Sequence, residues 1–366
     1  MSLLERVGRL LGELALHDLD ALLVSRPPNV RYLTAFTGSN GLALVSSGQI
    51  IFITDFRYLT QAEEEVAPVL PGVRIEIGTG DLLELAAQLV REQEPGARVG
   101  FDDRHLTVAE HRRLCELLDG GAVLVGCGGV VEALREVKEP SEQQRIAAAA
   151  QLADEALAQT LAQTGLIGRT EREIAIALEL QMRTLGAESA SFPTIVASGE
   201  HGALPHAQPR AVEVRRGQLV TIDWGAILDG YCSDCTRTFA AGEPSDHARE
   251  IYELVLAAQI AGLDALAVGR TGREVDAAAR AVIEQAGLGD HFGHGLGHGV
   301  GLEIHESPRL SKIAPEQPLR EGTVVTVEPG VYLPGELGVR IEDLVVLGCS
   351  GVRNLSSLSK ELSVLQ

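Results

Sequence analysis

The chain has 366 residues, of which 45% are hydrophobic, and its 51 acidic and 31 basic side chains give a formal net charge of −20. This length is sufficient for two domains with substantial cores. The acidic balance argues against a nucleic-acid or anionic-membrane partner, because phosphate binding depends on clustered Lys and Arg.

The N-terminal segment, MSLLERVGRLLGELALHDLD, has leucines at helical spacing, interrupted by charges at Glu5, Arg6, Arg9 and Glu13. It therefore lacks the apolar region of a signal peptide, and no later run approaches the length of a membrane span. The five cysteines are scattered and odd in number, which fits a reducing compartment better than a disulfide framework. We therefore expect a cytoplasmic protein.

Residues 20–127 alternate short apolar runs with helical patterns, which is typical of an α/β domain with a mixed sheet. Strands are predicted at 21–25, 42–45, 50–54, 73–77, 99–101 and 122–125, and helices at 82–91 and 109–118. No cluster of catalytic residue types occurs here. We expect the polar residues of this half to serve structure or dimer contacts.

A domain boundary is expected within 131–141, because Lys138-Glu-Pro-Ser141 combines a helix breaker with a cap. We place the first domain at 1–134 and the second at 135–366. In the second domain, helices are predicted from Ser141 to about residue 163, from 171 to 185 after a Thr170 cap, and at 248–266 and 271–286, with a strand at 192–196. Two helices followed by a hairpin occur twice, which suggests duplicated halves.

The first hairpin is predicted around Asp229-Gly230, which lies between two β-rich runs. A two-residue loop there places Asp223 opposite Thr236 and makes Asp234 its diagonal neighbour on the same face. Diagonal side chains lie roughly 7–8 Å apart and closer at their tips, within reach of shared cations. The alternative is that both acids are polar residues on a solvated face.

The spacing of Cys232-Ser-Asp-Cys235 also occurs in redox motifs, but it lies on the second strand of this hairpin. Residues three apart on a strand point to opposite faces, so the two thiols should not pair. We expect Cys235 to pack on the far face.

A second hairpin is predicted around Pro334-Gly335-Glu336, and centring it on Gly335 puts Glu328 directly opposite Glu342. Four carboxylates on partly buried sheet faces would raise one another's pKa values unless cations neutralised them. A site for two divalent metals is therefore the economical explanation.

Between the hairpins lies a segment rich in glycine and histidine, with His294, His298 and His305 as candidate nitrogen ligands. Its glycines, at 293, 295, 297, 299 and 301, are expected to allow close backbone approach and positive φ. Their strict alternation differs from G-x-G-x-x-G and from the Walker pattern, which argues against a nucleotide loop.

These motifs resemble the pita-bread metallopeptidases, which include Xaa-Pro dipeptidase (prolidase), Xaa-Pro aminopeptidase and methionine aminopeptidase. The resemblance covers nearly the whole chain. Segments 31–38 and 55–58 resemble the N-terminal domain of prolidases and creatinases. The implied fold is α/β (α+β): a small mixed-sheet N-terminal domain followed by a pita-bread catalytic domain, in a homodimer.

The resemblance also implies the site residues. The metal ligands would be Asp223, Asp234, His298, Glu328 and Glu342. The catalytic residues would be His206, His294, His305 and Glu328, with Glu328 as proton acceptor and His206 and His305 as donors to the substrate carbonyl oxygen. Arg309 would bind the substrate carboxylate; the alternative is an exposed arginine or one paired to Glu306. Arg340, a second candidate at the substrate side, would hold the carboxylates in place.

The implied chemistry is attack by a hydroxide that bridges two divalent cations, whose +4 charge balances four carboxylates. Oxygen-rich ligation suits Mn²⁺, with Co²⁺, Zn²⁺ or Fe²⁺ as alternatives. Three functions follow: a dipeptidase for Xaa-Pro, an aminopeptidase for longer peptides with Pro second or with N-terminal Met, and a non-catalytic peptide-binding module. The filled ligand set argues against the last, and the extra N-terminal domain against methionine aminopeptidase.

Overall fold

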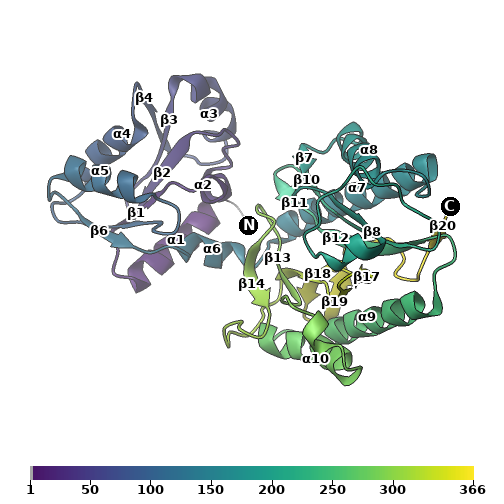
Figure 1. Ribbon diagram of the computed structural model, residues 1–366. Helices are drawn as coiled ribbons and strands as arrows, with labels where there is room; N and C mark the ends of the chain where they lie inside the picture. The colour runs from purple at the N-terminus through teal and green to yellow at the C-terminus, as the bar shows by residue number, and fades with distance from the viewer. Residues whose placement is uncertain (1–2) are drawn as a thin grey trace. The chain divides into compact units, whose positions relative to one another are not determined.

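The computed structural model describes residues 3–366, so Met1 and Ser2 of the predicted N-terminal helix lie outside the described residues (Figure 1). The chain forms two compact units, and the division falls between Arg135 and Glu136. Among the described helices, none is both long and apolar enough to cross a membrane.

The N-terminal unit is built on one six-stranded sheet in the order β4-β3-β2-β1-β5-β6. Strand β2 is antiparallel to β1 and β3, whereas the remaining neighbours are parallel, so the predicted mixed sheet is confirmed. The strands are β1 (Ala21–Val24), β2 (Gly41–Ser46), β3 (Ile50–Asp55), β4 (Arg74–Gly78), β5 (Arg98–Phe101) and β6 (Val123–Gly126). All six were predicted, with ends that differ by one residue at most.

The predicted helices of this unit, α4 (Leu82–Arg91) and α5 (Val108–Leu118), lie side by side and share a core with one face of the sheet (Figure 1). The expected N-terminal helix is α1 (Leu3–Leu16). Three short helices were not predicted: α2 (Pro27–Thr34), α3 (Leu59–Glu65) and α6 (Val130–Arg135). Helix α2 begins at a proline, which is favourable in the first helical turn because the N–H there needs no partner.

Four long helices cover the second unit: α7 (Pro140–Thr164), α8 (Glu171–Thr184), α9 (Asp246–Ala265) and α10 (Gly272–Gln285). The predicted Thr170 cap is confirmed, since its hydroxyl accepts from Glu173 N at 3.1 Å. The predicted Ser141 cap is wrong. Pro140 occupies the first helical turn, which makes Glu139 the N-cap residue and puts Ser141 inside the helix.

The first hairpin has the predicted register. Strand β10 (Ala226–Leu228) pairs with β11 (Tyr231–Cys232), and β9 (Leu219–Trp224) pairs with β12 (Cys235–Ala241), so that Asp223 lies opposite Thr236. Both turn residues have positive φ, 49° at Asp229 and 74° at Gly230, as a type I′ turn requires. The predicted strand at 192–196 is displaced towards β8 (Ile195–Ser198), which pairs with β9.

The second hairpin also has the predicted register, but its ladder is interrupted. Strand β15 (Val324–Val327) pairs with β18 (Asp343–Gly348), and β16 (Gly330–Leu333) pairs with β17 (Leu337–Arg340), in one continuous register that puts Glu328 level with Glu342. The backbone N–H of Glu328 donates instead to Leu296 O, and that of Glu342 to Thr236 O. These bonds connect the hairpin to its neighbouring strands.

The two halves of this unit each cover a sheet with a pair of helices. Helices α7 and α8 share a core with the four-stranded sheet β20-β12-β9-β8, where β20 is Val364–Leu365. Helices α9 and α10 share another with the five-stranded sheet β14-β13-β15-β18-β19. Its further strands are β13 (Gly297–Gly299), β14 (Glu306–Leu310) and β19 (Gly351–Asn354). The predicted repetition of two helices and a hairpin is therefore confirmed.

Candidate metal centre

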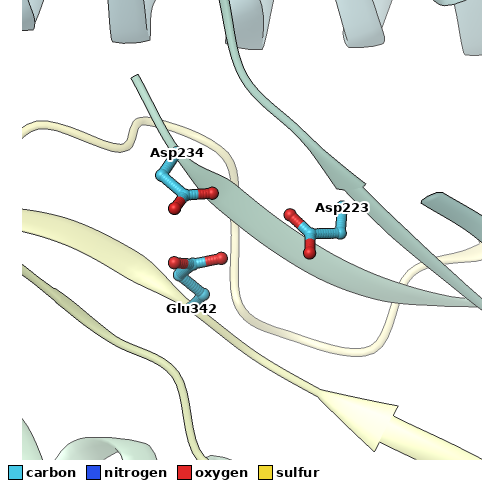
Figure 2. A group of neighbouring side chains, drawn as sticks. All are labelled: Asp223, Asp234 and Glu342. Atoms are coloured by element: carbon cyan, nitrogen blue, oxygen red, sulfur yellow. The ribbon is translucent and has the colours of Figure 1, made fainter. Parts of the chain in front are cut away.

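Three of the predicted ligands meet where the two hairpins approach each other. Asp223 lies near the end of β9, Asp234 in the gap between β11 and β12, and Glu342 directly before β18. One carboxylate oxygen of each lies within 4.8 Å of the others. Figure 2 shows the three side chains directed towards a common space from the teal and yellow parts of the chain.

The other two predicted ligands adjoin this group. His298 Nε2 lies 3.4 Å from Asp234 Oδ2 and 3.3 Å from Glu328 Oε1. His298 Nδ1 donates to Gly299 O at 3.1 Å, so in the neutral ring Nε2 carries a lone pair. Burial lowers the pKa of His298 to about 3, which keeps the ring neutral. A lone pair therefore faces two carboxylate oxygens, an arrangement that is unfavourable without a cation between them.

The carboxylates of Asp223 and Glu342 each have one oxygen held by the protein and one left bare. Asp223 Oδ2 accepts from Arg340 Nη2 at 2.7 Å, and Glu342 Oε2 accepts from Thr236 Oγ1 at 2.7 Å. The second oxygens, Asp223 Oδ1 and Glu342 Oε1, are buried without a hydrogen-bond partner. Because buried polar atoms are rarely left unpaired, this pattern fits oxygen ligands of divalent metal ions. We call Asp223, Asp234, His298, Glu328 and Glu342 the five-residue cluster.

The electrostatics of the cluster also fit bound cations. Burial raises the pKa of Asp234 well above its usual value, and the neighbouring charges of Glu342 and Asp223 raise it further. Burial and the charge of Glu328 do the same for Glu342. Burial raises the pKa of Glu328 to about 7, although the charge of Arg340 opposes this. Divalent ions would reverse these shifts by favouring the charged carboxylates.

His206 and His305 are exposed residues at the rim of the cluster. The His305 ring lies edge-on to His298, with 4.4 Å between the ring centroids. Burial lowers the pKa of His305, and the charges of Arg309 and His206 lower it further. Burial raises the pKa of Asp223, whereas the charges of Arg340 and, more weakly, His206 lower it. His206 and His305 are therefore close to each other and to the cluster.

His294 lies farther back and is connected to the cluster by hydrogen bonds. Its Nδ1 donates to Gly295 O at 2.8 Å, so its Nε2 accepts from the Tyr332 hydroxyl at 2.9 Å. The Tyr332 oxygen in turn accepts from Arg340 Nη1 at 2.9 Å, and Arg340 binds Asp223. Burial lowers the pKa of His294 to about 4, which keeps its ring neutral.

Arg340 is buried, and its guanidinium also donates to Thr236 Oγ1 and to Pro205 O. These bonds fix the Arg340 guanidinium, which in turn orients the Asp223 carboxylate.

The sequence analysis did not identify three polar residues of the site, Thr236, Thr326 and Tyr332. Thr326 Oγ1 accepts from His298 N and donates to Glu328 Oε1, both at 3.0 Å. Thr236 and Thr326 could have been suspected from the register, since each lies two residues from a predicted ligand.

Four glycines of the histidine segment, at 295, 297, 299 and 301, allow close approach of neighbouring atoms, whereas a Cβ at Gly293 would meet nothing. A Cβ at Gly297 would overlap Thr326 O, and one at Gly299 would overlap Ser307 O, so strands β14 and β15 can flank His298 closely. The predicted positive φ is wrong for all five glycines. Gly297 and Gly299 have an extended backbone instead, because they lie in β13, which pairs with strands on both sides.

The remaining predictions concern Arg309 and the cysteines. Arg309 lies on β14 directly opposite His298, is exposed, and makes no side-chain hydrogen bond or ion pair within residues 3–366.

All five cysteines are free. Cys232 and Cys235 lie in different core clusters, which confirms that they point to opposite faces.

Four carboxylates and a neutral imidazole, with bare ligand atoms between two similar α/β halves, define a metallopeptidase of the pita-bread fold. The chain belongs to metallopeptidase family M24, which it matches over residues 144–348. Residues 6–137 match the Creatinase/Prolidase N-terminal domain. The fold and the enzyme class expected from the resemblance are confirmed.

Similar proteins include dipeptidases and an aminopeptidase. The chain is 34% identical to the Xaa-Pro dipeptidase of Pyrococcus furiosus, over 98% of this chain and 99% of that protein. The structure of Xaa-Pro dipeptidase from Bacillus anthracis matches with a TM-score of 0.94, at 40% identity over 99% of this chain and 100% of that one. The X-Pro aminopeptidase from Thermotoga maritima matches with a TM-score of 0.89, at 36% identity over 98% and 99%. Relatives named for either activity therefore have this fold.

Proposed function

We propose that this protein hydrolyses the Xaa-Pro bond of dipeptides with two divalent cations held by the five-residue cluster. The observation that carries the proposal is Arg309, whose unpaired, exposed guanidinium lies across the strand pair from His298. A guanidinium binds a free carboxylate through two charge-assisted hydrogen bonds. A dipeptide presents that carboxylate one residue beyond the cleaved bond.

The oxygen-rich donor set favours Mn²⁺, and Co²⁺ or Zn²⁺ would also fit. Asp223 and Glu342 would ligate through their bare oxygens, and His298 through Nε2. When bound, a pair of divalent cations makes water a stronger acid and polarises the substrate carbonyl.

Glu328 is the proposed proton acceptor. Thr326 Oγ1 donates to its Oε1, which orients the carboxylate towards the cluster. His206 and His305 are the proposed donors to the carbonyl oxygen, since both are exposed at the rim, where a substrate can reach them. His294 acts farther back, through Tyr332 and Arg340, to hold Asp223.

The second candidate is an Xaa-Pro aminopeptidase for longer peptides, and the match to the Thermotoga maritima enzyme favours it. A longer peptide has an amide where a dipeptide has its carboxylate, so it cannot form the paired bonds with Arg309. We further propose a cytoplasmic homodimer, with residues 1–134 as the N-terminal domain and 135–366 as the catalytic domain.

Hydrolysis of Ala-Pro, Met-Pro and Ala-Pro-Gly, compared side by side, tests the proposal. The protein is first stripped with a chelator and then supplied with Mn²⁺. We expect no activity before the addition, and a higher kcat/KM for Ala-Pro than for Ala-Pro-Gly after it. Equal kcat/KM values for Ala-Pro and Ala-Pro-Gly would contradict the dipeptidase proposal and favour the aminopeptidase proposal.

A further inference from the structure

The segment that carries His206 has little regular structure of its own. It begins at Ser198, at the end of β8, includes a short 3₁₀ helix (Gly199–Ala203), and continues without helix or strand to Arg210. We call residues 198–210 the His206 loop. Catalysis by an exposed side chain on such a loop requires the loop to be fixed by other residues.

One carboxylate holds both ends of this loop. Glu171 Oε1 accepts from Ser198 N and Ser198 Oγ, each at 2.8 Å, at the start of the loop. Glu171 Oε2 accepts from Arg210 N at 3.0 Å at its end. Between them, His201 Nδ1 lies 2.9 Å from Oε2. Glu171 therefore connects residues of the loop that are twelve positions apart in the sequence.

The carboxylate is buried and ionised. Glu171 is 0% exposed and is the first residue of α8, immediately after the Thr170 cap. Burial alone would raise the pKa of Glu171, but hydrogen bonds from the backbone N–H groups of Ser198 and Arg210 outweigh it and lower the pKa. A helix N-terminus also favours a negative charge at this position. Every partner of this carboxylate in the loop is a donor, so the group acts as a fixed acceptor.

The middle of the loop is held from the opposite side. A Cβ at Gly338 on β17 would overlap Gly202 O, which indicates close backbone packing. Arg340 Nη1 donates to Pro205 O at 3.2 Å, one residue before His206. The same arginine orients Asp223. His206 is therefore an exposed residue on a loop that is fixed at its ends by Glu171 and in its middle by β17.

We propose that Glu171 is a positioning residue for the reaction: it holds the His206 loop so that the imidazole meets the substrate carbonyl. The inference rests on the proposed role of His206. Within residues 3–366, Glu171 forms no side-chain hydrogen bond or ion pair with the five-residue cluster, His206 or His305. Its effect should therefore reach the rate only through the loop.

Glu171→Gln is the informative substitution, because it keeps the size of the side chain. It replaces one acceptor oxygen by an NH₂ donor that would face donors at Ser198, His201 or Arg210. We expect kcat to fall on the order of tenfold or more, with metal content unchanged. Glu173→Ala is the matched control. It removes the capping box of the same helix, so it should lower the melting temperature but leave kcat unchanged.

A double-mutant cycle with His206→Ala, made in the full-length metal-loaded enzyme, tests the connection. If Glu171 acts through His206, Glu171→Gln lowers kcat in the wild-type background but not in the His206→Ala background. Hydrogen exchange across residues 198–210 should also become faster in Glu171→Gln and not in Glu173→Ala. Equal losses of kcat in both backgrounds, or unchanged exchange in the loop, would overturn the inference. A wild-type kcat for His206→Ala alone, with faster loop exchange in Glu171→Gln, would instead refute the proposed role of His206.

Discussion

Lys138 forms a buried ion pair with Glu306, in which Nζ lies 3.0 Å from Oε2. The two side chains are 1% and 6% exposed. Glu306 is the acidic residue nearest to Arg309 along β14, yet it is directed to Lys138. Because Glu306 is paired with Lys138, it does not occupy the Arg309 guanidinium, which is left available for a substrate. The ion pair also fixes the position of Glu306, which directly follows His305.

Removal of the lysine charge should destabilise the protein. We expect Lys138→Met to lower the free energy of unfolding by about 3 kcal/mol, because it takes away the buried cation beside a buried carboxylate. The measurement is urea denaturation followed by circular dichroism. Lys312→Met is the control, since its ion pair with Glu284 is exposed and 3.8 Å long, and its loss should cost less than about 1 kcal/mol. Similar values for the two variants would contradict the importance of the buried pair.

Asp234→Asn should nearly abolish activity. The amide loses the charge and one strong oxygen ligand, so we expect kcat/KM to fall roughly 10³-fold or more and metal occupancy to drop. Metal analysis and turnover of the purified variant measure both. Asp229→Asn is the matched control in the same hairpin, because asparagine tolerates the positive φ of 49° at that turn position. Full occupancy and normal turnover in Asp234→Asn would refute the ligand assignment.

The metal-free protein should lose stability as the pH rises. The pKa of Glu328 is about 7 in the folded state against an ordinary value of 4.5. Between these values the folded state binds a proton that the unfolded state has released, so the free energy of unfolding falls with increasing pH, on the order of 3 kcal/mol from this group. The raised pKa values of Asp234 and Glu342 act in the same direction.

Urea denaturation of chelator-stripped protein at about pH 5 and about pH 7.5 checks the sign. With excess Mn²⁺ the dependence should reverse, because protons then compete with the cations for the carboxylates. Higher stability of the stripped protein at the upper pH would show that the carboxylates do not repel one another as described.

The acidic residues of the site could be predicted from the sequence because turn geometry fixes register. Asp229-Gly230 determines which residues pair, and that register continues through Gly225 to Asp223. The same holds for Gly335 and the glutamates at 328 and 342. The interruption of strand pairing at Glu328 and Glu342 could not be predicted, because it depends on backbone hydrogen bonds to Leu296 and Thr236, which are distant in sequence.

The residues that hold the His206 loop and the five-residue cluster in place could not be predicted either, because their contacts are also distant in sequence. Glu171 and Arg210 are 39 positions apart, and Tyr332 meets His294 across 38 positions, so no local period connects them. Two errors were local. Pro27-Pro28 begins a helix that the apolar pattern does not indicate, and Pro140 occupies the first turn of α7, so the serine after it is not the cap.

Replacement of the exposed histidines His206 and His305 should lower kcat but have little effect on metal binding. We expect His206→Ala and His305→Ala to lower kcat on the order of 10²-fold while metal content stays unchanged, because neither is in the five-residue cluster. His247→Ala, an exposed histidine on α9, is the control and should leave kcat unchanged. A loss of melting temperature without a loss of kcat would indicate a structural role for either residue.

Arg309 should determine the preference for dipeptides. Its guanidinium has no ion-pair partner within residues 3–366, so a substrate carboxylate would be its first. We expect Arg309→Ala to raise KM for Ala-Pro by a factor worth ~1.5–3 kcal/mol, with a much smaller change in kcat. Lys312→Ala, an exposed cation three residues further along, is the matched control for general electrostatic attraction and should change KM little. The ratio of kcat/KM for Ala-Pro to that for Ala-Pro-Gly is the deciding quantity, because loss of the carboxylate partner should bring it towards one. If Arg309→Ala leaves this ratio unchanged, Arg309 does not bind the substrate carboxylate. The preference for dipeptides must then arise from other residues around the five-residue cluster.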